Sequence, residues 1–361
     1  MDPSRRRDAA AVSRLSAVTS DPSASPRAAT IYDVARRAQV SHETVSRVLR
    51  GNPAVKEKNR ERVQRALSEL NYRPNTTARA LATSRSRRIG AMVYDLIESG
   101  PSQFVEGATE AARAAGYLLD IVSINTRDDR SVMSAIDLLN QPDLAGLIAV
   151  TPTDHAREAV ASTNFRIPVF QESEAEDAPH ATSVSLNTIG TELAVRHLLD
   201  LGHRRIVHIA GPAGWVSARN RAHAYERTMR SADLEPEIIE SSDWSAASGH
   251  ALASVMPLRG VTAILAANDQ IAIGTLLALH DRGIGVPDDI SVAGFDDIPE
   301  SKFVIPPLTT VRLQFEQAGR RAVLCLLAEI EGTEVPAEAS RGSVLAELVV
   351  RRSTAKANAA R

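Results

Sequence analysis

Six polar side chains gather in the first part of the stretch VSHETVSRVLRG, residues 40–51, beside apolar residues that recur at helical spacing. They are Ser41, His42, Glu43, Thr44, Ser46 and Arg47. An arginine can contact guanine in a bidentate manner and a glutamate can accept from the cytosine amino group, whereas hydroxyls suit phosphate oxygens. These residue types favour a helix that reads DNA in the major groove. The alternative is an ordinary solvated helix face.

A second group of polar and aromatic side chains follows short apolar runs later in the chain. It comprises Tyr94, Asp95, Trp215, Arg219, Arg221, Trp244, Asn268, Asp269, Gln270, Asp296 and Asp297. Carboxylate, amide and guanidinium groups around an indole suit a sugar, because its hydroxyls need polar partners and its apolar face stacks on an aromatic ring. Structural roles are the alternative: Asp269 as a helix cap or structural acid, Asp297 as a cap or ion-pair partner, and Tyr94 as part of a cleft wall.

Charge is distributed unevenly along the 361 residues. Residues 1–90 hold 19 Lys and Arg against 8 Asp and Glu, a balance of +11, and the other 271 residues hold 23 against 36, a balance of −13. We therefore expect the first part, and not the second, to meet a polyanion. Residues 1–29 have no continuous apolar segment and predict a disordered arm rather than a signal peptide. With no membrane-spanning run and a single cysteine, the chain is expected in the cytoplasm.

Three short helices are predicted in the basic part. Thr30 and Asp33 supply a cap and a first-turn carboxylate for the first helix. Ser41 can cap a second helix that ends at Leu49, and a third helix covers roughly residues 56–70. The short turn between the first two makes this a helix-turn-helix arrangement.

The run TIYDVARRAQVSHETVSRVLRGNPAVKEKNRERVQRALSELNYRPN, residues 30–75, resembles the DNA-binding domain of the lactose-repressor (LacI/GalR) family almost without gaps. The resemblance implies that Tyr32 and Asn71 support contacts with the DNA backbone. Gln39 departs from the family, which usually has glycine in this turn. A positive φ at Gln39 would carry a steric cost.

The segment after Pro74 predicts a hinge. Asn75 can cap a helix of about two turns, which is too short to be stable alone in water. The resemblance implies a hinge helix that orders on operator DNA beside its twin from a second subunit. Ala78 would permit close approach in the minor groove, and Leu81 would wedge between base steps and bend the duplex. An ordinary linker is the alternative.

From residue 88 onward, short apolar runs alternate with amphipathic helices. The predicted strands are RIGAMVYDL, YLLDIVSI, LAGLIAV, ATSVSL, RIVHIAG, VTAILAAN and DISVAGF. Such runs separated by helices predict parallel sheets covered on both faces. Two halves of this kind make an α/β core of two Rossmann-like subdomains, whose ligands bind at the carboxyl ends of the strands.

The effector core of the same family, which is periplasmic-binding-protein-like, is resembled by three runs: ANDQIAIG, DISVAGFDD and IPPLTTV. A fourth run, DWSAASG, is similar to that of members that sense galactosides or related β-linked sugars. The resemblance implies effector contacts by Arg221, Trp244, Asn268 and Asp296, with Tyr94 or Asp95 from the first subdomain. Leu186 and Leu313 stand where relatives often have polar residues, which leaves the sugar open.

These features predict a disordered arm (1–29), an all-α helix-turn-helix domain (30–74), a hinge helix and linker (75–87), an effector-binding and dimerisation core (88–352) and a tail (353–361). The predicted function is a DNA-binding transcriptional regulator, a repressor that binds a near-palindromic operator as a homodimer and is released by a small sugar. The tail lacks leucine heptads, which favours a dimer over a tetramer.

An enzyme has little support in this sequence. It has no Gly-rich phosphate loop, no G-x-S-x-G elbow and no His/Cys metal spacing, so no catalytic residue, metal or cofactor is predicted. Two other functions stay open. One is the sugar receptor of a transport system, against which the fused DNA-binding module argues, and the other is a regulator that senses a nucleobase.

Overall fold

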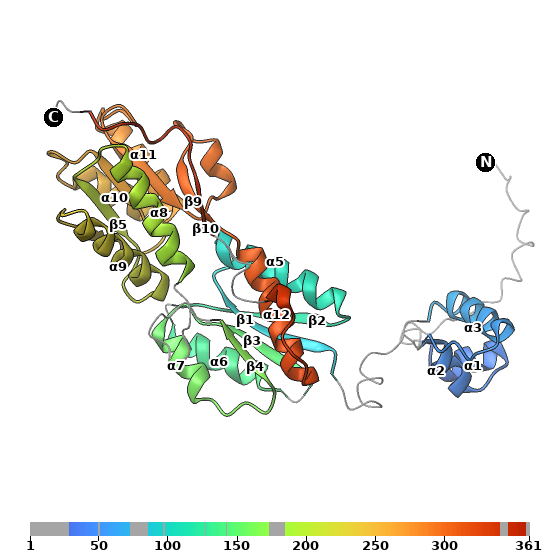
Figure 1. The fold of residues 1–361 in the computed structure, drawn as a ribbon. Helices are drawn as coiled ribbons and strands as arrows, with labels where there is room; N and C mark the ends of the chain where they lie inside the picture. Colours follow the sequence, from blue (N-terminus) through green and yellow to red (C-terminus); the bar gives the residue numbers. More distant parts are fainter. Residues whose placement is uncertain are drawn as a thin grey trace, which may run out of the picture. The chain divides into compact units, whose positions relative to one another are not determined.

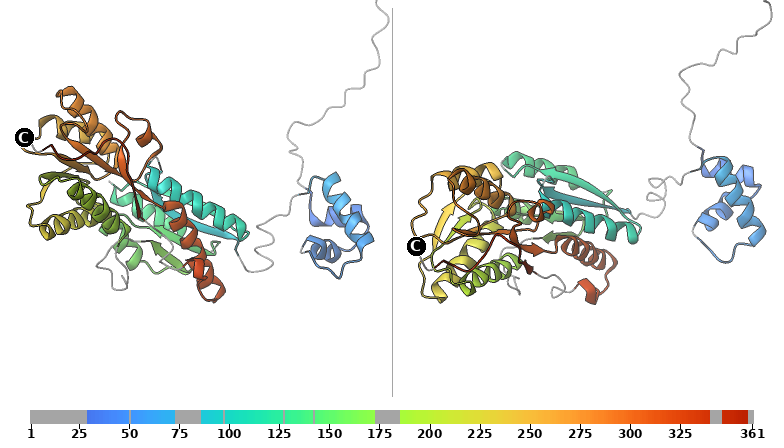
Figure 2. Two further views of the ribbon diagram at one scale, coloured as in Figure 1. Left: turned by 45° about the horizontal axis from the view of Figure 1, so that its top comes forward. Right: turned by 90° about the horizontal axis from the view of Figure 1, so that it is seen from above.

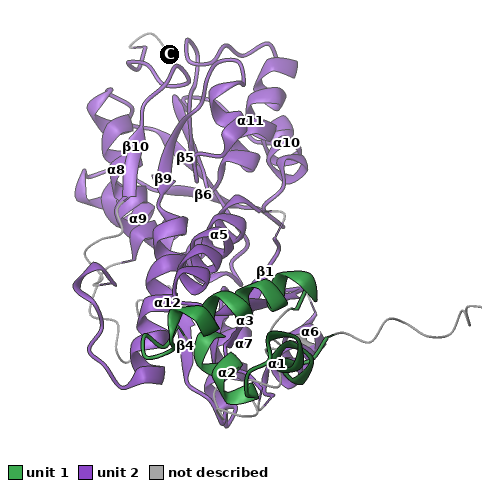
Figure 3. Ribbon diagram, turned by 90° about the vertical axis from the view of Figure 1, so that its right-hand side faces the viewer, with its two compact units in different colours: residues 1–84 green, residues 85–361 purple. Residues whose placement is uncertain are grey.

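The computed structural model describes residues 29–49, 51–72, 86–96, 98–126, 128–141, 143–172, 185–339 and 346–358. The chain divides into two compact units, unit 1 (residues 1–84) and unit 2 (residues 85–361), drawn in different colours in Figure 3. Each unit has a hydrophobic core of its own. No helix in these described ranges is long and apolar enough to cross a membrane.

Unit 1 contains three short helices, α1 (Ile31–Ala38), α2 (His42–Leu49) and α3 (Glu57–Glu69). A capping box begins α1: the Asp33 amide donates to Thr30 Oγ1 at 3.3 Å, and the Thr30 amide donates to Asp33 Oδ2 at 2.9 Å. Val34, Val45 and Val63, one from each helix, are fully buried between them. The predicted helix-turn-helix arrangement is confirmed.

The N-lobe of unit 2 is built on a parallel sheet in the order β2-β1-β3-β4. Its strands are β1 (Arg88–Tyr94), β2 (Leu118–Ile124), β3 (Gly146–Val150) and β4 (Val169–Glu172). Helices α5 (Ser99–Ala114) and α12 (Phe315–Glu331) cover one face, and α6 (Asp129–Leu139) and α7 (Asp154–Ser162) cover the other (Figures 1 and 2). A Cβ atom on Gly107 of α5 would lie 1.9 Å from the Glu316 carbonyl oxygen, so α5 and α12 pack backbone against backbone there.

The C-lobe contains a second sheet in the order β10-β9-β8-β7-β5-β6, parallel except for β10. Its strands are β5 (Ile206–Ala210), β6 (Glu237–Glu240), β7 (Ala263–Ala266), β8 (Ser291–Phe295), β9 (Thr309–Leu313) and β10 (Ala346–Val349). Helices α8 (Leu186–Asp200) and α9 (Val216–Ser231) cover one face, and α10 (Ala246–Val255) and α11 (Asp269–Asp281) cover the other (Figure 1). The predicted α/β core of two covered parallel sheets is confirmed. Two short 3-10 helices, η1 (Pro299–Lys302) and η2 (Ala337–Ala339), lie in the connections.

One predicted strand, ATSVSL, is wrong where the structure describes it. Ser185 is the N-cap of α8, with its Oγ accepting from the Asn187 amide at 3.1 Å, and Leu186 is the first helical residue. Residues 181–184 of that run lie outside the described residues. The alternation of apolar and polar residues suggested a strand, but the serine instead satisfies a free amide of the helix.

The C-terminal segment also differs from the expected tail. Ser353 is fully buried, and its Oγ donates to the Val292 carbonyl at 2.6 Å and accepts from the Thr309 amide at 2.7 Å. The Ala357 amide donates to the Leu201 carbonyl at 2.9 Å. Residues 353–358 therefore pack onto the C-lobe.

Candidate functional site

The candidate DNA-reading face of unit 1 lies on α2. Ser41 caps the helix, with its Oγ accepting from the Thr44 amide at 3.2 Å and lying 2.9 Å from Thr44 Oγ1. His42, Glu43 and Arg47 are exposed, whereas Thr44 and Ser46 are partly buried. The apolar side of α2 packs into the core of unit 1, so its polar residues project outward in the arrangement that base and phosphate contacts need.

Tyr32 of α1 extends this face. Its side chain is 62 % exposed, and its ring centroid lies 5.3 Å from that of His42. An exposed phenol held beside the first turn of α2 can reach a phosphate while leaving the base-reading positions free. The structure therefore brings Tyr32 together with the polar start of α2.

The turn before α2 adopts the strained geometry that the sequence raised as a possibility. Gln39 is the C-cap of α1 and has φ 53° and ψ 49°, in the left-handed region. Its Oε1 accepts from Arg62 Nη2 of α3 at 2.9 Å. Because non-glycine residues carry a cost there, this exposed contact offsets part of a penalty that glycine would avoid.

The predicted hinge contacts, Asn75, Ala78 and Leu81, lie outside the described residues. Asn71 is described and has φ 45°, just after α3. The hinge therefore stays a prediction.

Arg221 is the centre of the candidate effector cleft in unit 2. It projects from α9 with a side-chain exposure of 6 %. Its Nε donates to Asn187 Oδ1 at 2.7 Å, Nη2 donates to Asp296 Oδ1 at 3.2 Å, and Nη1 donates to the Ala267 carbonyl. These contacts fix the guanidinium at the carboxyl ends of β7 and β8, where ligands bind in this type of fold.

Aromatic rings surround this guanidinium. Its central carbon lies 3.8 Å from the ring centroid of Phe295 and 5.5 Å from that of Trp244. Trp244 is in edge contact with Trp215 at 5.5 Å, and Trp215 with Tyr94 of the N-lobe at 5.1 Å. Trp244 Nε1 is buried and has no hydrogen-bond partner among the residues that the structure describes. A buried indole N–H without an acceptor is unfavourable, so an acceptor from a ligand would stabilise it.

Asn268 lies in the cleft and makes two hydrogen bonds with the protein itself. Its Oδ1 accepts from the Ile271 amide at 2.8 Å and so caps α11, while its Nδ2 donates to the Trp244 carbonyl at 3.0 Å. The residue is 2 % exposed. Its side chain thereby ties the start of α11 to the loop that carries the indole.

Asp269 is a structural acid, as one of the two interpretations of the sequence had it. Its carboxylate is fully buried and accepts from the Thr310 hydroxyl at 2.5 Å, the Ser301 hydroxyl at 2.5 Å and the Ile298 amide at 2.9 Å. Burial raises the pKa of Asp269 to about 7, and these hydrogen bonds oppose the rise. The carboxylate organises the loop that follows β8.

That loop presents Asp296 to the cleft and Asp297 away from it. Both residues have positive φ, 102° and 51° respectively, so the backbone turns sharply after β8. Asp297 forms ion pairs with Arg312 at 2.6 Å and Arg351 at 2.6 Å, which confirms its alternative role as an ion-pair partner. Burial raises the pKa of Asp296, and the neighbouring Arg221 guanidinium opposes that rise.

The N-lobe contributes Tyr94, Asp95 and one residue that the sequence did not single out, Glu98. Asp95 follows β1 and has φ 32°. Glu98 Oε2 accepts from Gln270 Nε2 of the C-lobe at 3.1 Å, a hydrogen bond that joins the two lobes beside the cleft. Burial raises the pKa of Glu98, and the carboxylates of Asp296, Asp95 and Asp243 add to the rise.

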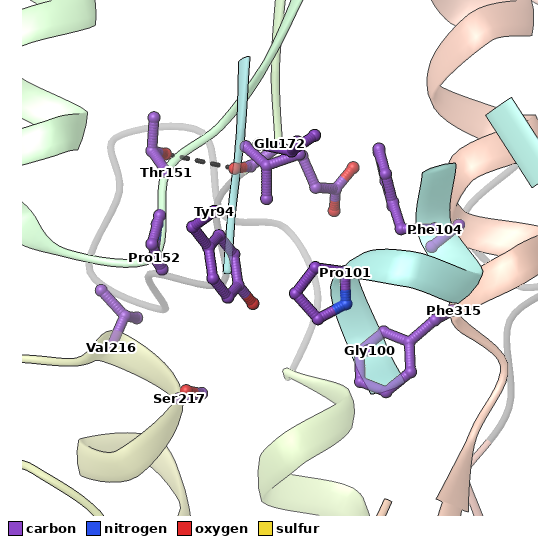
Figure 4. Close-up of a pocket in the computed structure, with 13 residues that line it drawn as sticks. Tyr94, Gly100, Pro101, Phe104, Thr151, Pro152, Glu172, Val216, Ser217 and Phe315 are labelled. Atoms are coloured by element: carbon purple, nitrogen blue, oxygen red, sulfur yellow. Dashed lines mark hydrogen bonds between the residues drawn. The ribbon is translucent and has the colours of Figure 1, made fainter. Parts of the chain in front are cut away.

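A pocket adjoins this polar group at Tyr94 and lies mostly within the N-lobe. Its walls are largely apolar and come from Tyr94, Pro101, Phe104, Pro152, Val216 and Phe315, among others. Figure 4 shows Tyr94 at its centre, with Pro101 on one side and Pro152 and Val216 on the other. Glu172 closes one end, and its carboxylate is held by Arg321 at 2.8 and 2.9 Å. Tyr94 therefore belongs to the cleft wall, which was one of its two expected roles.

Two further contacts join the lobes on the side of α7 and α9. Arg219 Nη2 donates to Asp154 Oδ2 at 2.8 Å, and the Val216 amide donates to the Pro152 carbonyl at 3.0 Å. In the ranges that the structure covers, no group of three or more His, Cys, Asp or Glu side chains is arranged to hold a metal ion.

A capped helix-turn-helix unit joined to a two-lobed α/β core with a polar, aromatic cleft defines the class of ligand-responsive transcriptional regulators. Two family descriptions match the chain: "Bacterial regulatory proteins, lacI family" over residues 30–75 and "Periplasmic binding protein-like domain" over residues 195–354. The chain is 35 % identical over 334 residues to the lactose operon repressor of Escherichia coli (strain K12), an alignment that covers 91 % of each protein. The chain belongs to the lacI family, whose members are transcriptional regulators and not enzymes.

Solved structures agree with this assignment. A crystal structure of the lac repressor dimer bound to operator and the anti-inducer ONPF is similar with a TM-score of 0.80 and 33 % identity, covering 91 % of this chain and 99 % of that one. A complex of the transcriptional regulator CelR with cellobiose has a TM-score of 0.63 and 26 % identity, covering 90 % and 99 %. Both lobes and the helix-turn-helix unit of this chain thus have counterparts in regulators of the same family.

Proposed function

We propose that this protein is a repressor that binds operator DNA as a homodimer and releases it when a small sugar occupies the cleft of unit 2. The observation that carries the proposal is the buried Arg221–Asp296 pair beside Trp244, whose indole N–H has no acceptor in the described part of the chain. This arrangement offers donors, acceptors and an aromatic face within one cleft, the combination that a sugar needs.

The operator contacts are assigned from the exposed start of α2. Arg47, His42 and Glu43 are the base-reading residues, and the hydroxyls of Ser41, Thr44 and Ser46, together with Tyr32, contact phosphates. Asn75, Ala78 and Leu81 complete the assignment in a hinge helix that inserts into the minor groove. Similarity to an operator-bound lac repressor supports this assignment.

The sugar contacts are assigned from the cleft. Arg221 and Asp296 bind neighbouring hydroxyls, Trp244 packs on the sugar ring, and Asn268 holds Trp244 in place through the Trp244 carbonyl. Tyr94 and Asp95 approach from the N-lobe. Relatives of similar structure bind ONPF and cellobiose, which supports a sugar or sugar derivative as the ligand class.

A second copy of the chain is the proposed partner of the exposed apolar residues of unit 2. Leu118 and Ile121 are 63 % and 41 % exposed on β2, which is an edge strand of the N-lobe sheet. Val255 and Leu277, on α10 and α11 of the C-lobe, are 80 % and 54 % exposed. Apolar surface of this kind favours association, and the solved lac repressor is a dimer. Dimerisation then gives two α2 helices for the two halves of a near-palindromic site.

The sugar controls DNA binding through its different affinity for two arrangements of the lobes. Glu98–Gln270 and Asp154–Arg219 join the lobes directly, so a ligand in the cleft changes the interactions that set their relative position. In a dimer, movement of the N-lobes changes the spacing of the two hinge segments and weakens operator binding. We place this action in the cytoplasm, where operator DNA is accessible.

A thermal-shift screen of the full-length protein against mono- and disaccharides, with nucleobases and nucleosides as a second arm, tests the proposal. We expect a sugar to raise the melting temperature and to lower affinity for operator DNA. Asp296→Ala should lose both responses, whereas Asp281→Ala, an exposed carboxylate of the same lobe, should keep them. Stabilisation by a nucleobase alone would replace the sugar by the other ligand class, and stabilisation by neither would refute the proposal.

A further inference from the structure

Trp215 of the C-lobe has an aromatic ring that lies between the two lobes. Its ring centroid is 5.1 Å from that of Tyr94 in the N-lobe and 5.5 Å from that of Trp244 in the C-lobe. Both are edge contacts with an interplanar angle of 79°. Such contacts stabilise an arrangement beyond the area that they bury. The ring of Trp215 therefore has a favourable contact with each lobe.

The backbone at Trp215 is also bonded to the N-lobe. Thr153 and Trp215 form an isolated antiparallel bridge between the lobes. The amide of the next residue, Val216, donates to the Pro152 carbonyl at 3.0 Å. Within the C-lobe, the Trp215 amide donates to the Pro212 carbonyl at 3.0 Å, and Trp215 is the N-cap residue of α9. The backbone is thus held where the lobes meet, and the side chain contacts a ring on each side.

The two rings beside Trp215 each belong to a well-fixed part of one lobe. Tyr94 ends β1, an inner strand of the N-lobe sheet. The carbonyl of Trp244 accepts from Asn268 Nδ2 at 3.0 Å, and a Cβ atom on Gly211 would lie 2.4 Å from the indole. Because Tyr94 moves with one lobe and Trp244 with the other, a change in lobe arrangement changes the space in which the Trp215 ring lies.

We propose that Trp215 is the positioning residue through which a sugar bound on Trp244 acts on the N-lobe. This inference rests on the proposed function and adds the side chain that links the sugar to the lobe arrangement. The sugar and Trp215 both contact the Trp244 indole, so a sugar there changes the position that the Trp215 ring can take. Its contact with Tyr94 then differs between the two lobe arrangements, and a difference of this kind is what control requires.

The first experiment measures the coupling factor, which is the ratio of sugar affinities of the full-length protein free and saturated with operator DNA. The probe is whichever of glucose, galactose, mannose, lactose and cellobiose gives the largest thermal shift. We expect Trp215→Leu to lower the factor about fivefold, the size of one aromatic contact, and Trp215→Phe, which keeps a ring, to lower it less.

Phe165→Leu is the matched control. It alters a half-buried ring that packs against the core of the N-lobe, and it should leave the coupling factor unchanged. The melting temperature of each variant without sugar establishes that it is folded. Because the factor compares two affinities of the same variant, a protein that is merely less stable gives the wild-type value.

A second measurement uses the wild-type protein labelled with 5-fluorotryptophan. The chain has 2 tryptophans, so two fluorine resonances are expected, and Trp215→Phe identifies that of Trp215. We expect operator DNA to shift the Trp215 resonance of the sugar-saturated protein, because the lobe arrangement changes while the sugar stays bound.

The outcomes separate this inference from the proposed function. If sugar weakens operator binding in the wild type, an unchanged coupling factor in Trp215→Leu or an unmoved Trp215 resonance overturns the inference and leaves the proposed function intact. If no sugar binds the wild type, or a bound sugar leaves operator affinity unchanged, both are refuted.

Discussion

His208 gives the structure a measurable dependence of stability on pH. It lies in the centre of β5 and is 1 % exposed, with Nδ1 2.9 Å from the Leu265 carbonyl oxygen. Its Nε2 has no hydrogen-bond partner within the described ranges. Burial lowers the pKa of His208 from 6.5 to about 4, the hydrogen bond to Leu265 opposes this change, and the nearby Arg221 charge adds to it. The imidazole is therefore neutral in the folded protein at neutral pH.

The sign and size of the effect follow from linkage. Because the unfolded chain binds the proton more tightly than the folded one, the folded state loses stability as pH falls below 6.5, until His208 is protonated in both states below about pH 4. The full loss is about 3 kcal/mol, and roughly 2 kcal/mol of it is reached between pH 7.5 and pH 5. His208→Leu removes this contribution, because leucine has a similar size and no titrating group.

The assay is urea unfolding of the wild type and the variant at pH 7.5 and pH 5. Tryptophan fluorescence reports the C-lobe specifically, because the chain has 2 tryptophans and both, Trp215 and Trp244, lie there. The wild type should lose about 2 kcal/mol more than His208→Leu on acidification. His223→Leu, an exposed histidine on α9, is the control and should behave as the wild type. Equal pH dependence in the wild type and His208→Leu would show that the buried imidazole titrates normally and refute the reasoning.

Three other predictions concern a turn, a buried acid and the reading face. Gln39→Gly should make α1 and α2 about 1 kcal/mol more stable than Gln39→Ala does, as measured by hydrogen exchange. Both variants lose the contact with Arg62, and only glycine adopts the left-handed backbone without steric strain. Equal protection in the two variants would contradict this. Asp269→Asn should lower the free energy of unfolding, followed by fluorescence, by about 2–4 kcal/mol, because an NH2 group replaces one of the two oxygens that together accept three hydrogen bonds. The exposed control Asp281→Asn should lower it far less. A loss below about 1 kcal/mol for Asp269→Asn would count against the buried network. Arg47→Ala should lower the ratio of operator to random-DNA affinity about tenfold in anisotropy titrations, and an equal loss on both DNAs would exclude base reading.

The sequence predicted the fold best where one local signal determines one element. Thr30 and Asp33 form the cap that their spacing suggested, and buried strands such as β3 of the N-lobe and β7 of the C-lobe are continuous apolar runs. β4, with the sequence VFQE and every residue only partly buried, was not recognised because it lacks such a run. The run ATSVSL was misread because its serine serves a helix and not a strand.

The candidate site was predicted in part for the same reason. Trp244 and Asp296 lie in loops that follow strands, and Arg221 lies in the second turn of the helix after β5, so the order of strands and helices places them at one edge of the sheet. Glu98 has no such local signal, since its importance comes from a partner 172 residues away, Gln270. The ion pairs of Asp297 with Arg312 and Arg351 likewise depend on a loop geometry that the sequence does not display.

The coupling between cleft and operator is tested most directly by measuring the affinity of the sugar found in the screen for the full-length protein, free and saturated with operator DNA. Linkage requires that the sugar and the DNA weaken each other by the same factor. The account predicts a lower sugar affinity in the DNA complex, matched by an equal loss of DNA affinity when sugar is bound. A sugar that binds the free and the DNA-bound protein equally well would contradict it.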